Sequence, residues 1–175
     1  LTKELEKQQS KSYDNDSENY WKLTVDKAEN GFAVIRFLPP PENEDIPFVK
    51  IFNHSFQGPT GKYYINKSLT TLGQSDPVGE FNSKLWNTGR EIDKEQAKKQ
   101  KRKTEYVSNI YVIKDPANKD NEGKVFLFKY GKKIFDMIND KMNPAASEYE
   151  EVAPVNPFDF WEGCNFNLRA IKADG

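Results

Sequence analysis

The sequence predicts a mainly β domain in which helices are inserted between short strands. Apolar and polar residues alternate in several short runs, Gly and Pro separate these runs, and two segments show helical spacing instead. The strands and helices do not follow the regular alternation of a parallel α/β sheet. A chain of 175 residues with 36% hydrophobic residues can enclose one core, and it has no apolar run approaching the roughly 20 residues of a membrane span.

The first part of the chain predicts an arm followed by a β-hairpin. Residues 1–20 are polar and rich in Gln, Ser and Asp, so we expect a flexible arm ahead of a core at 21–175. Apolar residues alternate from Trp21 to Val25, and Asn30-Gly31 is typical of a hairpin turn. The apolar run at 32–38 supplies the second strand of this hairpin.

Two further strands and a helix are expected next. Residues 39–41 are all Pro, which ends the strand because proline has no N–H to donate, and strand character returns at 48–52 and 62–65. Ser75 or Asp76 ahead of a proline at position 77 is typical of a helix start. We therefore expect a helix from position 77 to about Asn87.

The second half of the chain alternates between strand and helix signals. Residues 90–101 are charged with almost no apolar face, so we expect them to be solvated and mobile. Runs at 106–114 and 124–130, with turn residues between them, predict a second hairpin. Helical apolar spacing over 131–142 predicts a core-facing helix, and 161–171 predicts a last strand.

This set of elements fits a small, partly open, five-stranded β-barrel of the OB-fold type. In that arrangement the segment at about 54–104 is a small helical and loop subdomain, inserted after the third or fourth strand. We expect the core to be monomeric when no ligand is bound.

Charge is sorted by region, although 26 basic and 27 acidic residues leave a net charge of −1. Residues 94–103 hold six basic residues against one acid, and residues 119–133 hold five Lys against two acids. Residues 141–163 are acidic. A basic cleft on a nearly neutral molecule is compatible with this pattern.

The most informative cluster is a basic run that leads into an aromatic residue. Lys98, Lys99, Lys101, Arg102 and Lys103 precede Tyr106 at the start of a predicted strand. Single-stranded nucleic acid requires this pairing, because cations displace counterions from phosphates and an aromatic face stacks on a base. A solvated charge run with no ligand is the alternative.

Other rings and one cation bear on this choice. Arg36 lies within an apolar strand, where its side chain must either reach solvent or line a groove. Trp86 ends the predicted helix before Gly89. Phe126, Phe128 and Tyr130 share one strand face, for which core packing is favoured over a stacking surface.

Catalysis has no strong candidate site. A single cysteine excludes an intramolecular disulfide and, with a single histidine, a four-ligand Cys/His zinc site. His54 and Cys164 are the only nucleophile pair of this type, and no catalytic signature surrounds either. We expect a binding module and not an enzyme.

The order of several motifs resembles the single-stranded DNA-binding proteins of T-even-type bacteriophages. The resemblance covers roughly residues 20–175. It is carried by Ala33–Pro39, Asn53-His54, Lys101–Tyr106 with Asn109-Ile110, Lys114–Ala117, Asn121–Phe126, Gly131–Ile134, and Trp161–Gly163 before Asn165-Phe166.

The resemblance implies an OB-fold core that binds single-stranded DNA in a basic, aromatic-lined cleft. Such proteins act in phage DNA replication, recombination and repair in the cytoplasm of the infected bacterial host, and they destabilise duplexes by preferring single strands. Arg36, Lys101, Arg102 and Lys103 would contact phosphates, and Trp86, Tyr106 and Phe128 would face DNA. With the neighbouring cations, the candidate DNA-binding set is Arg36, Trp86, Lys98, Lys99, Lys101, Arg102, Lys103, Tyr106, Phe128 and Lys132.

One departure from the family concerns a metal. The resemblance implies a structural zinc held by one His and three Cys, but here only His54 remains, and Ser68, Asp76 and Gly79 stand at the cysteine positions. We therefore expect no zinc. We expect the subdomain to be held instead by the packing of three apolar residues, namely Phe81, Leu85 and Trp86.

Other departures concern the lining of the cleft and the tails. Gln74, Ala97 and Val107 stand where the family often has aromatic residues, so the lining is thinner. The family's basic N-terminal segment and acidic C-terminal tail, which serve cooperativity and the recruitment of replication and recombination proteins, are not seen here. We expect little cooperativity. An OB-type module for RNA or protein partners is the alternative function.

Overall fold

The computed structural model describes residues 19–145 and 152–172, and it divides into two compact units. The inserted unit comprises residues 49–106, and the sheet unit comprises the flanking segments up to Phe48 and from Val107 onward. The predicted arm at 1–20 falls almost entirely outside the described residues. None of the helices in the described segments is long and apolar enough to cross a membrane.

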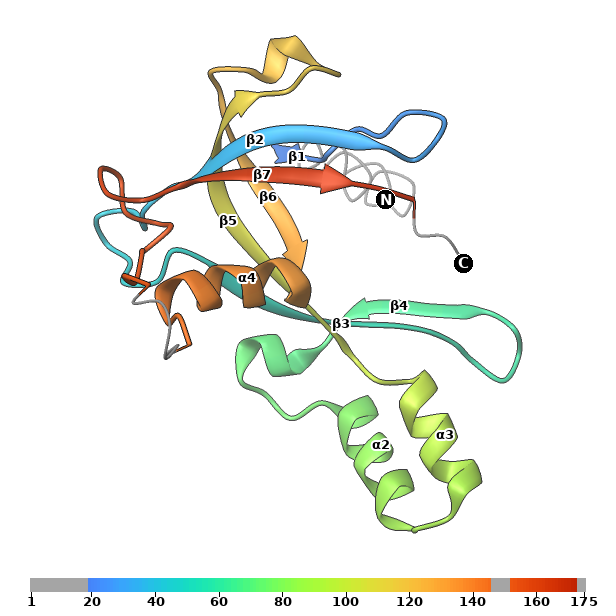
Figure 1. The fold of residues 1–175 in the computed structure, drawn as a ribbon. Helices are drawn as coiled ribbons and strands as arrows, with labels where there is room; N and C mark the ends of the chain where they lie inside the picture. Colours follow the sequence, from blue (N-terminus) through green and yellow to red (C-terminus); the bar gives the residue numbers. More distant parts are fainter. Residues whose placement is uncertain (1–18, 146–151, 173–175) are drawn as a thin grey trace, which may run out of the picture. The chain divides into compact units, whose positions relative to one another are not determined.

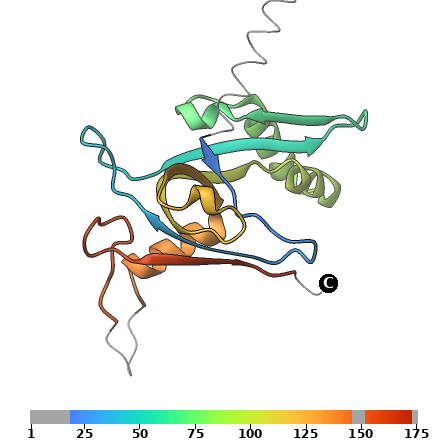
Figure 2. The same ribbon diagram turned by 90° about the horizontal axis from the view of Figure 1, so that it is seen from above.

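The sheet unit is built on strands in the order β1-β6-β5-β2-β7. Their bounds are β1 Tyr20–Trp21, β2 Gly31–Phe37, β5 Lys103–Lys114, β6 Val125–Gly131 and β7 Asn165–Ala170, and β5 begins in the inserted unit. β1 pairs in parallel with β6, whereas β2 pairs antiparallel with β5 and β7, so the sheet is mixed. Figures 1 and 2 both show β7 running beside β2. The expectation of a mainly β fold is confirmed.

Two helical elements complete this unit, the short 3₁₀ turn η2 (Lys119–Asn121) and helix α4 (Lys132–Met142). The prediction of a helix at 131–142 is confirmed, and Ile138 on its apolar face is buried. The last strand covers 165–170, which is shorter than predicted, and its residues alternate between exposed and half-buried positions.

The core of the sheet unit is centred on Phe37. Ala33, Ile35 and Phe37 alternate along β2 and are fully buried, as the period of two predicts. The Phe37 ring lies 5.0–5.5 Å, centroid to centroid, from three other aromatic rings in edge contacts. These three rings belong to Tyr130, Phe158 and Phe166. Such edge contacts add to the burial energy of the rings.

The predicted hairpin at 21–38 is wrong, because its first strand pairs elsewhere. Only Tyr20 and Trp21 form a strand, and Trp21 lies opposite Phe128 in β6. The buried Trp21 indole contacts the Phe128 ring and donates a 2.9 Å hydrogen bond to Asp115 Oδ2. Residues 22–30 therefore form a loop, which closes where Asp26 Oδ1 accepts from the N–H groups of residues 28 and 30.

The inserted unit begins with an antiparallel pair, β3 (Val49–Gln57) and β4 (Tyr63–Lys67). The 3₁₀ turn η1 (Leu69–Leu72) follows, and then α2 (Pro77–Asn87) and α3 (Glu91–Lys99), which contact each other. The prediction of α2 is confirmed, with Asp76 as its N-cap and Pro77 in the first turn.

Residues 91–99, which lie in the charged segment expected to be solvated and mobile, form helix α3, and most of them are exposed. The buried Asp93 carboxylate stabilises the start of this helix, because it accepts from Thr88 Oγ1 at 2.6 Å and from Arg90 Nε at 2.7 Å. Lys98 and Lys99 lie in the last turn, where positive charge favours the helix dipole. Sequence periodicity misses such a helix, because these contacts are polar.

Candidate nucleic-acid interface

An open groove of about 1020 Å³ lies within the inserted unit. It runs between residues of η1, α2, the end of α3 and the segment that leads into β5. Its charged lining comprises Lys84, Lys98, Lys101 and Arg102 against the carboxylates of Asp76 and Glu80. Four of the candidate DNA-binding residues, Trp86, Lys98, Lys101 and Arg102, are thus brought together at one site.

Trp86 supplies the aromatic surface of this groove. It lies near the end of α2 and is 50% exposed, so part of its surface is available to a ligand in the groove. Its position among cations gives the combination of ring and positive charge that binds single strands. Stacking on such a ring contributes about 1–3 kcal/mol per base.

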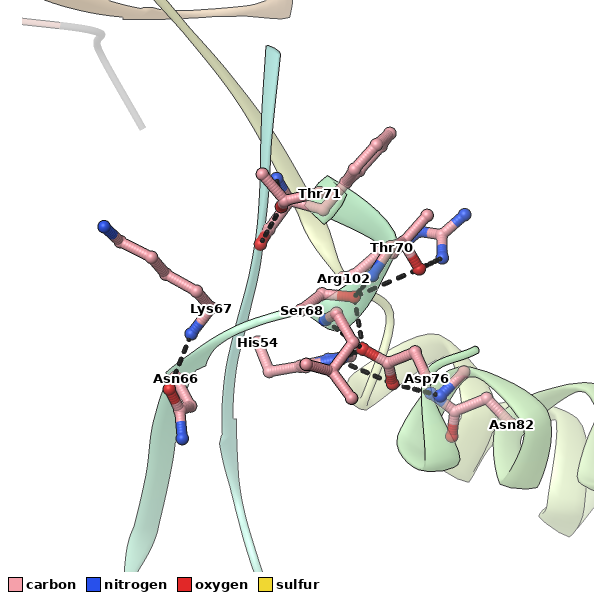
Figure 3. Close-up of polar contacts among 12 residues, drawn as sticks. His54, Asn66, Lys67, Ser68, Thr70, Thr71, Asp76, Asn82 and Arg102 are labelled. Carbon is pink, nitrogen blue, oxygen red and sulfur yellow. Dashed lines mark hydrogen bonds and ion pairs between the residues drawn. The ribbon is translucent and has the colours of Figure 1, made fainter. Parts of the chain in front are cut away.

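Arg102 is fixed in orientation within the groove. One of its guanidinium nitrogens donates a 2.8 Å hydrogen bond to Thr70 Oγ1 (Figure 3). The guanidinium also lies 4.7 Å from the centroid of the Phe52 ring. Because a guanidinium carries five N–H donors, this side chain keeps donors that could bind an anion, and its contacts already restrict its freedom.

Three other candidate cations lie outside this groove. Lys99 is exposed in the last turn of α3, and Lys103 is exposed at the first position of β5. Lys132 belongs to the sheet unit and forms an ion pair with Asp136 at 2.7 Å on the first turns of α4.

Arg36 is half-buried in β2, and its guanidinium forms hydrogen bonds with the segment that precedes and begins β7. Its guanidinium donates to the carbonyl oxygens of Asp159 and Phe160, at 3.3 and 3.0 Å, and to Asn165 Oδ1 at 3.3 Å. These bonds anchor the loop that precedes β7. Gly163 belongs to the same loop, and a Cβ atom at this position would lie 3.2 Å from the Arg36 guanidinium and 2.3 Å from the Asp159 carbonyl oxygen.

Two aromatic candidates have almost no exposed surface. Tyr106 and Phe128 are each 6% exposed, and the Phe128 ring stacks on Tyr130 with centroids 5.5 Å apart. For Phe128, the structure therefore shows core packing, the arrangement that the sequence favoured. In this conformation neither ring offers a face on which a base could stack.

A cluster of hydrogen-bonded polar side chains lies on the wall of the groove, at the positions that the sequence analysis named for the implied zinc ligands but to which it gave no role. The Asp76 carboxylate accepts hydrogen bonds from Ser68 Oγ, from Leu69 N at 3.1 Å and from Gly79 N at 2.8 Å, and it lies 2.9 Å from His54 Nε2 (Figure 3). Burial raises the pKa of Asp76, but the hydrogen bonds from Ser68, His54 and Gly79 outweigh it and hold the pKa below the usual carboxyl range. The sequence analysis missed Lys84, because a single Lys on a helix carries no sequence signal.

The expectation that apolar packing of α2 holds the inserted unit is wrong. None of the residues of α2 is buried, and Phe81 and Trp86 are 49% and 50% exposed. The enzymatic alternative gains no support from His54, whose Nε2 is occupied by the Asp76 carboxylate, or from Cys164, which lies in the other unit.

Known proteins similar to this chain are DNA-binding proteins. The family profile described as "gp32 DNA binding protein like" matches residues 29–175. A single-stranded DNA-binding protein of Enterobacteria phage T4 is 43% identical over 170 residues, which is 95% of this chain and 54% of that protein. The corresponding protein of Enterobacteria phage T2 is 43% identical over 167 residues, 93% of this chain and 53% of the relative.

A further relative, the single-stranded DNA-binding protein of Enterobacteria phage RB70, is 41% identical over 98 residues, 54% of this chain and 80% of its own length. The chain spans about half the length of the T4 and T2 relatives. The family profile covers most of the chain, and the identity to the T4 relative extends over nearly all of it. The chain therefore belongs to the gp32-like family of DNA-binding proteins.

Proposed function

We propose that this chain binds single-stranded DNA without sequence specificity. The observation that carries the proposal is the groove of the inserted unit, in which an exposed tryptophan, Trp86, stands among four cations. Family membership supports it, since the T4 and T2 relatives are named single-stranded DNA-binding proteins. We expect stacking and phosphate contacts to dominate, because an exposed ring and cations bind every base and every phosphate alike.

The chemistry of binding follows from the residues that line the groove. Lys84, Lys98, Lys101 and Arg102 would neutralise phosphates and release condensed counterions, while Trp86 stacks on a base. Lys99 and Lys103 lie near these residues in sequence and are exposed, so they would contact phosphates that continue beyond the groove. Arg36, Tyr106, Phe128 and Lys132 would take a smaller part, because other groups of the chain already contact them.

We also propose that the sheet unit is an OB-type barrel. The support is its short, mixed strands in the order β1-β6-β5-β2-β7, with a helix, α4, between the last two strands of the chain. A partly open barrel of five strands has this composition. In the OB folds that bind oligonucleotides, one face of the barrel contributes to binding.

In this proposal the protein acts in phage DNA replication, recombination and repair in the cytoplasm of the infected host, and it is not an enzyme. Binding single strands more tightly than duplex shifts the helix–coil equilibrium toward separated strands without ATP. The monomeric state of the core, its low cooperativity and partner proteins that bind through tails remain predictions from the family resemblance.

Binding should be specific for single strands and should weaken with salt. Titration of the chain with oligo-dT is expected to quench tryptophan fluorescence, whereas a matched duplex is not. Log K should fall linearly with log salt at a slope of about −2 to −4, which corresponds to roughly three to six neutralised phosphates on a single strand. Competition with a matched RNA oligomer separates DNA from RNA preference, and an absence of salt-dependent binding to any single strand would favour a protein-interaction module.

Trp86 should be the principal stacking residue. Trp86→Ala is expected to weaken binding to oligo-dT by about 5- to 150-fold, because a stacked base contributes about 1–3 kcal/mol. Fluorescence anisotropy of a labelled oligomer is the suitable measurement, since the substitution also removes an intrinsic fluorophore. Trp161→Ala is the matched control, because Trp161 is 85% exposed in the sheet unit and lies outside the groove. Equal losses for the two variants would contradict the role given to Trp86.

A further inference from the structure

The four positions at which the family resemblance implies zinc ligands lie together in the inserted unit. His54 Nε2 lies 2.9 and 3.1 Å from the two carboxylate oxygens of Asp76, and Ser68 Oγ donates to the same carboxylate. A Cβ atom built on Gly79 would lie 3.6 Å from both the Cβ and the Oδ1 atom of Asp76, so a side chain at position 79 would also reach this cluster. The positions converge, whereas the residue types differ from the implied ligands.

The residues present do not fit a zinc ion. Structural zinc sites are tetrahedral and use thiolates, imidazoles and carboxylates, but this cluster offers one imidazole, one carboxylate, one hydroxyl and a glycine. Because an ionised carboxylate can only accept, the hydrogen bond to Asp76 assigns the proton to Nε2 of His54, so the atom that faces Asp76 offers a metal no lone pair. The lone pair lies on Nδ1, which has no hydrogen-bond partner in the described part of the chain. Across residues 19–145 and 152–172, no group of three or more His, Cys, Asp or Glu side chains could hold a metal ion.

We propose that the Asp76 carboxylate replaces the metal as the hub of the inserted unit, joining β3, η1 and α2 and thereby positioning the α2 wall of the DNA-binding groove. The effect of Asp76 on the stability of the inserted unit does not depend on the proposed function, whereas its effect on DNA binding rests on that function.

The first argument is the number of elements that meet at one carboxylate. Asp76 takes one hydrogen bond from His54 in β3 and one from Ser68, the N-cap of η1. It takes another from Leu69 N in the first turn of η1 and a fourth from Gly79 N in the first turn of α2. Hydrogen bonds to an ionised acceptor are roughly twice as strong as neutral ones. Loss of this one side chain would release all three elements together.

The second argument is the scarcity of apolar burial around the cluster. Within residues 49–106, all of which the structure describes, the only buried hydrophobic residues are Ala97 and Tyr106. The buried polar residues of the same range are His54, Ser68, Asp76 and Asp93. A unit with so small an apolar core depends on another cross-link, as small domains generally do. Ser68 and His54, each 2% exposed, place that cross-link in the interior.

The third argument links the cluster to the groove. His54, Asp76 and Gly79 all line the groove, and the helix that Asp76 caps carries Lys84 and Trp86 on the same wall. Asp76 is therefore a positioning residue, which acts on a ligand through the placement of α2. Its effect should appear first in local protection of η1 and α2.

The wild-type chain should contain no zinc and should not depend on any. Protein purified from zinc-supplemented cells, analysed by inductively coupled plasma mass spectrometry, is expected to hold substoichiometric zinc. Its thermal midpoint should be unchanged by EDTA or by added Zn²⁺. Stoichiometric zinc, or a midpoint that falls on chelation, would overturn the proposal, and this holds whether or not the chain binds DNA.

Asp76→Asn should loosen a defined part of the inserted unit. Amide hydrogen exchange in η1 and the first turns of α2 is expected to accelerate by about 5- to 150-fold. The reason is that buried donors lose their ionised acceptor, which lowers the free energy of local unfolding. β2 in the sheet unit should keep its protection. Asp93→Asn is the matched control, because Asp93 is an equally buried carboxylate whose partners, Thr88 and Arg90, lie at the start of α3. Unchanged exchange in the Asp76 variant, or the same pattern in both variants, would refute the hub.

Restoring the thiolates should create a metal site. The variant Ser68→Cys/Asp76→Cys/Gly79→Cys, which keeps His54, is expected to bind one equivalent of Co²⁺ with the charge-transfer and d–d absorption of a tetrahedral thiolate site. Bound metal should return the exchange protection of η1 and α2 that is lost in its metal-free form. The same variant with His54→Gln lacks the fourth protein ligand and serves as control. Absence of the thiolate bands would show that the four positions do not converge, and would overturn the geometry on which the proposal stands.

Discussion

The buried carboxylate of Asp76 imposes the main constraint on the inserted unit. A carboxylate taken out of water is costly unless hydrogen-bond donors replace its hydration, and four donors from β3, η1 and α2 do so here. Each donor must therefore stay close to the same point. The path of the chain between residues 54 and 79 follows from this requirement, and with it the start of the helix that carries Trp86.

Elements marked by a cap or by regular apolar spacing could be predicted from the sequence, whereas elements that depend on distant partners or on polar contacts could not. α2 begins where a capping Asp precedes a Pro, and α4 follows from apolar residues at helical spacing, so both were found. A strand was expected from Trp21, but its pairing with β6 escaped prediction, because that pairing and the hydrogen bond from Trp21 to Asp115 join residues about 100 positions apart. α3 escaped because its contacts are between polar side chains, which leave no apolar period.

Only part of the candidate site could be predicted from the sequence. A basic run is visible in a sequence, and three of its members, Lys98, Lys101 and Arg102, line one groove with Trp86. Burial of an aromatic ring is not visible in the same way, because a strand face can point toward a core or toward a ligand. Phe128 has the same spacing in either case, and only the contacts with Trp21 and Tyr130 assign it to the core.

In the proposed hub, hydrogen bonds take the place of a metal, which changes what the fold would depend on. The binding of zinc by thiolates varies with metal supply and with oxidation of the cysteines. A carboxylate hub needs neither metal nor reduced thiols, but it concentrates the cross-link in one ionised side chain. The sequence shows that the cysteines are absent, whereas their replacement becomes visible only when Ser68, Asp76 and Gly79 are seen around His54. In this chain, the placement of the Trp86 helix therefore depends on charge and hydrogen-bond geometry, which act over a few ångströms and leave no periodic trace in the sequence.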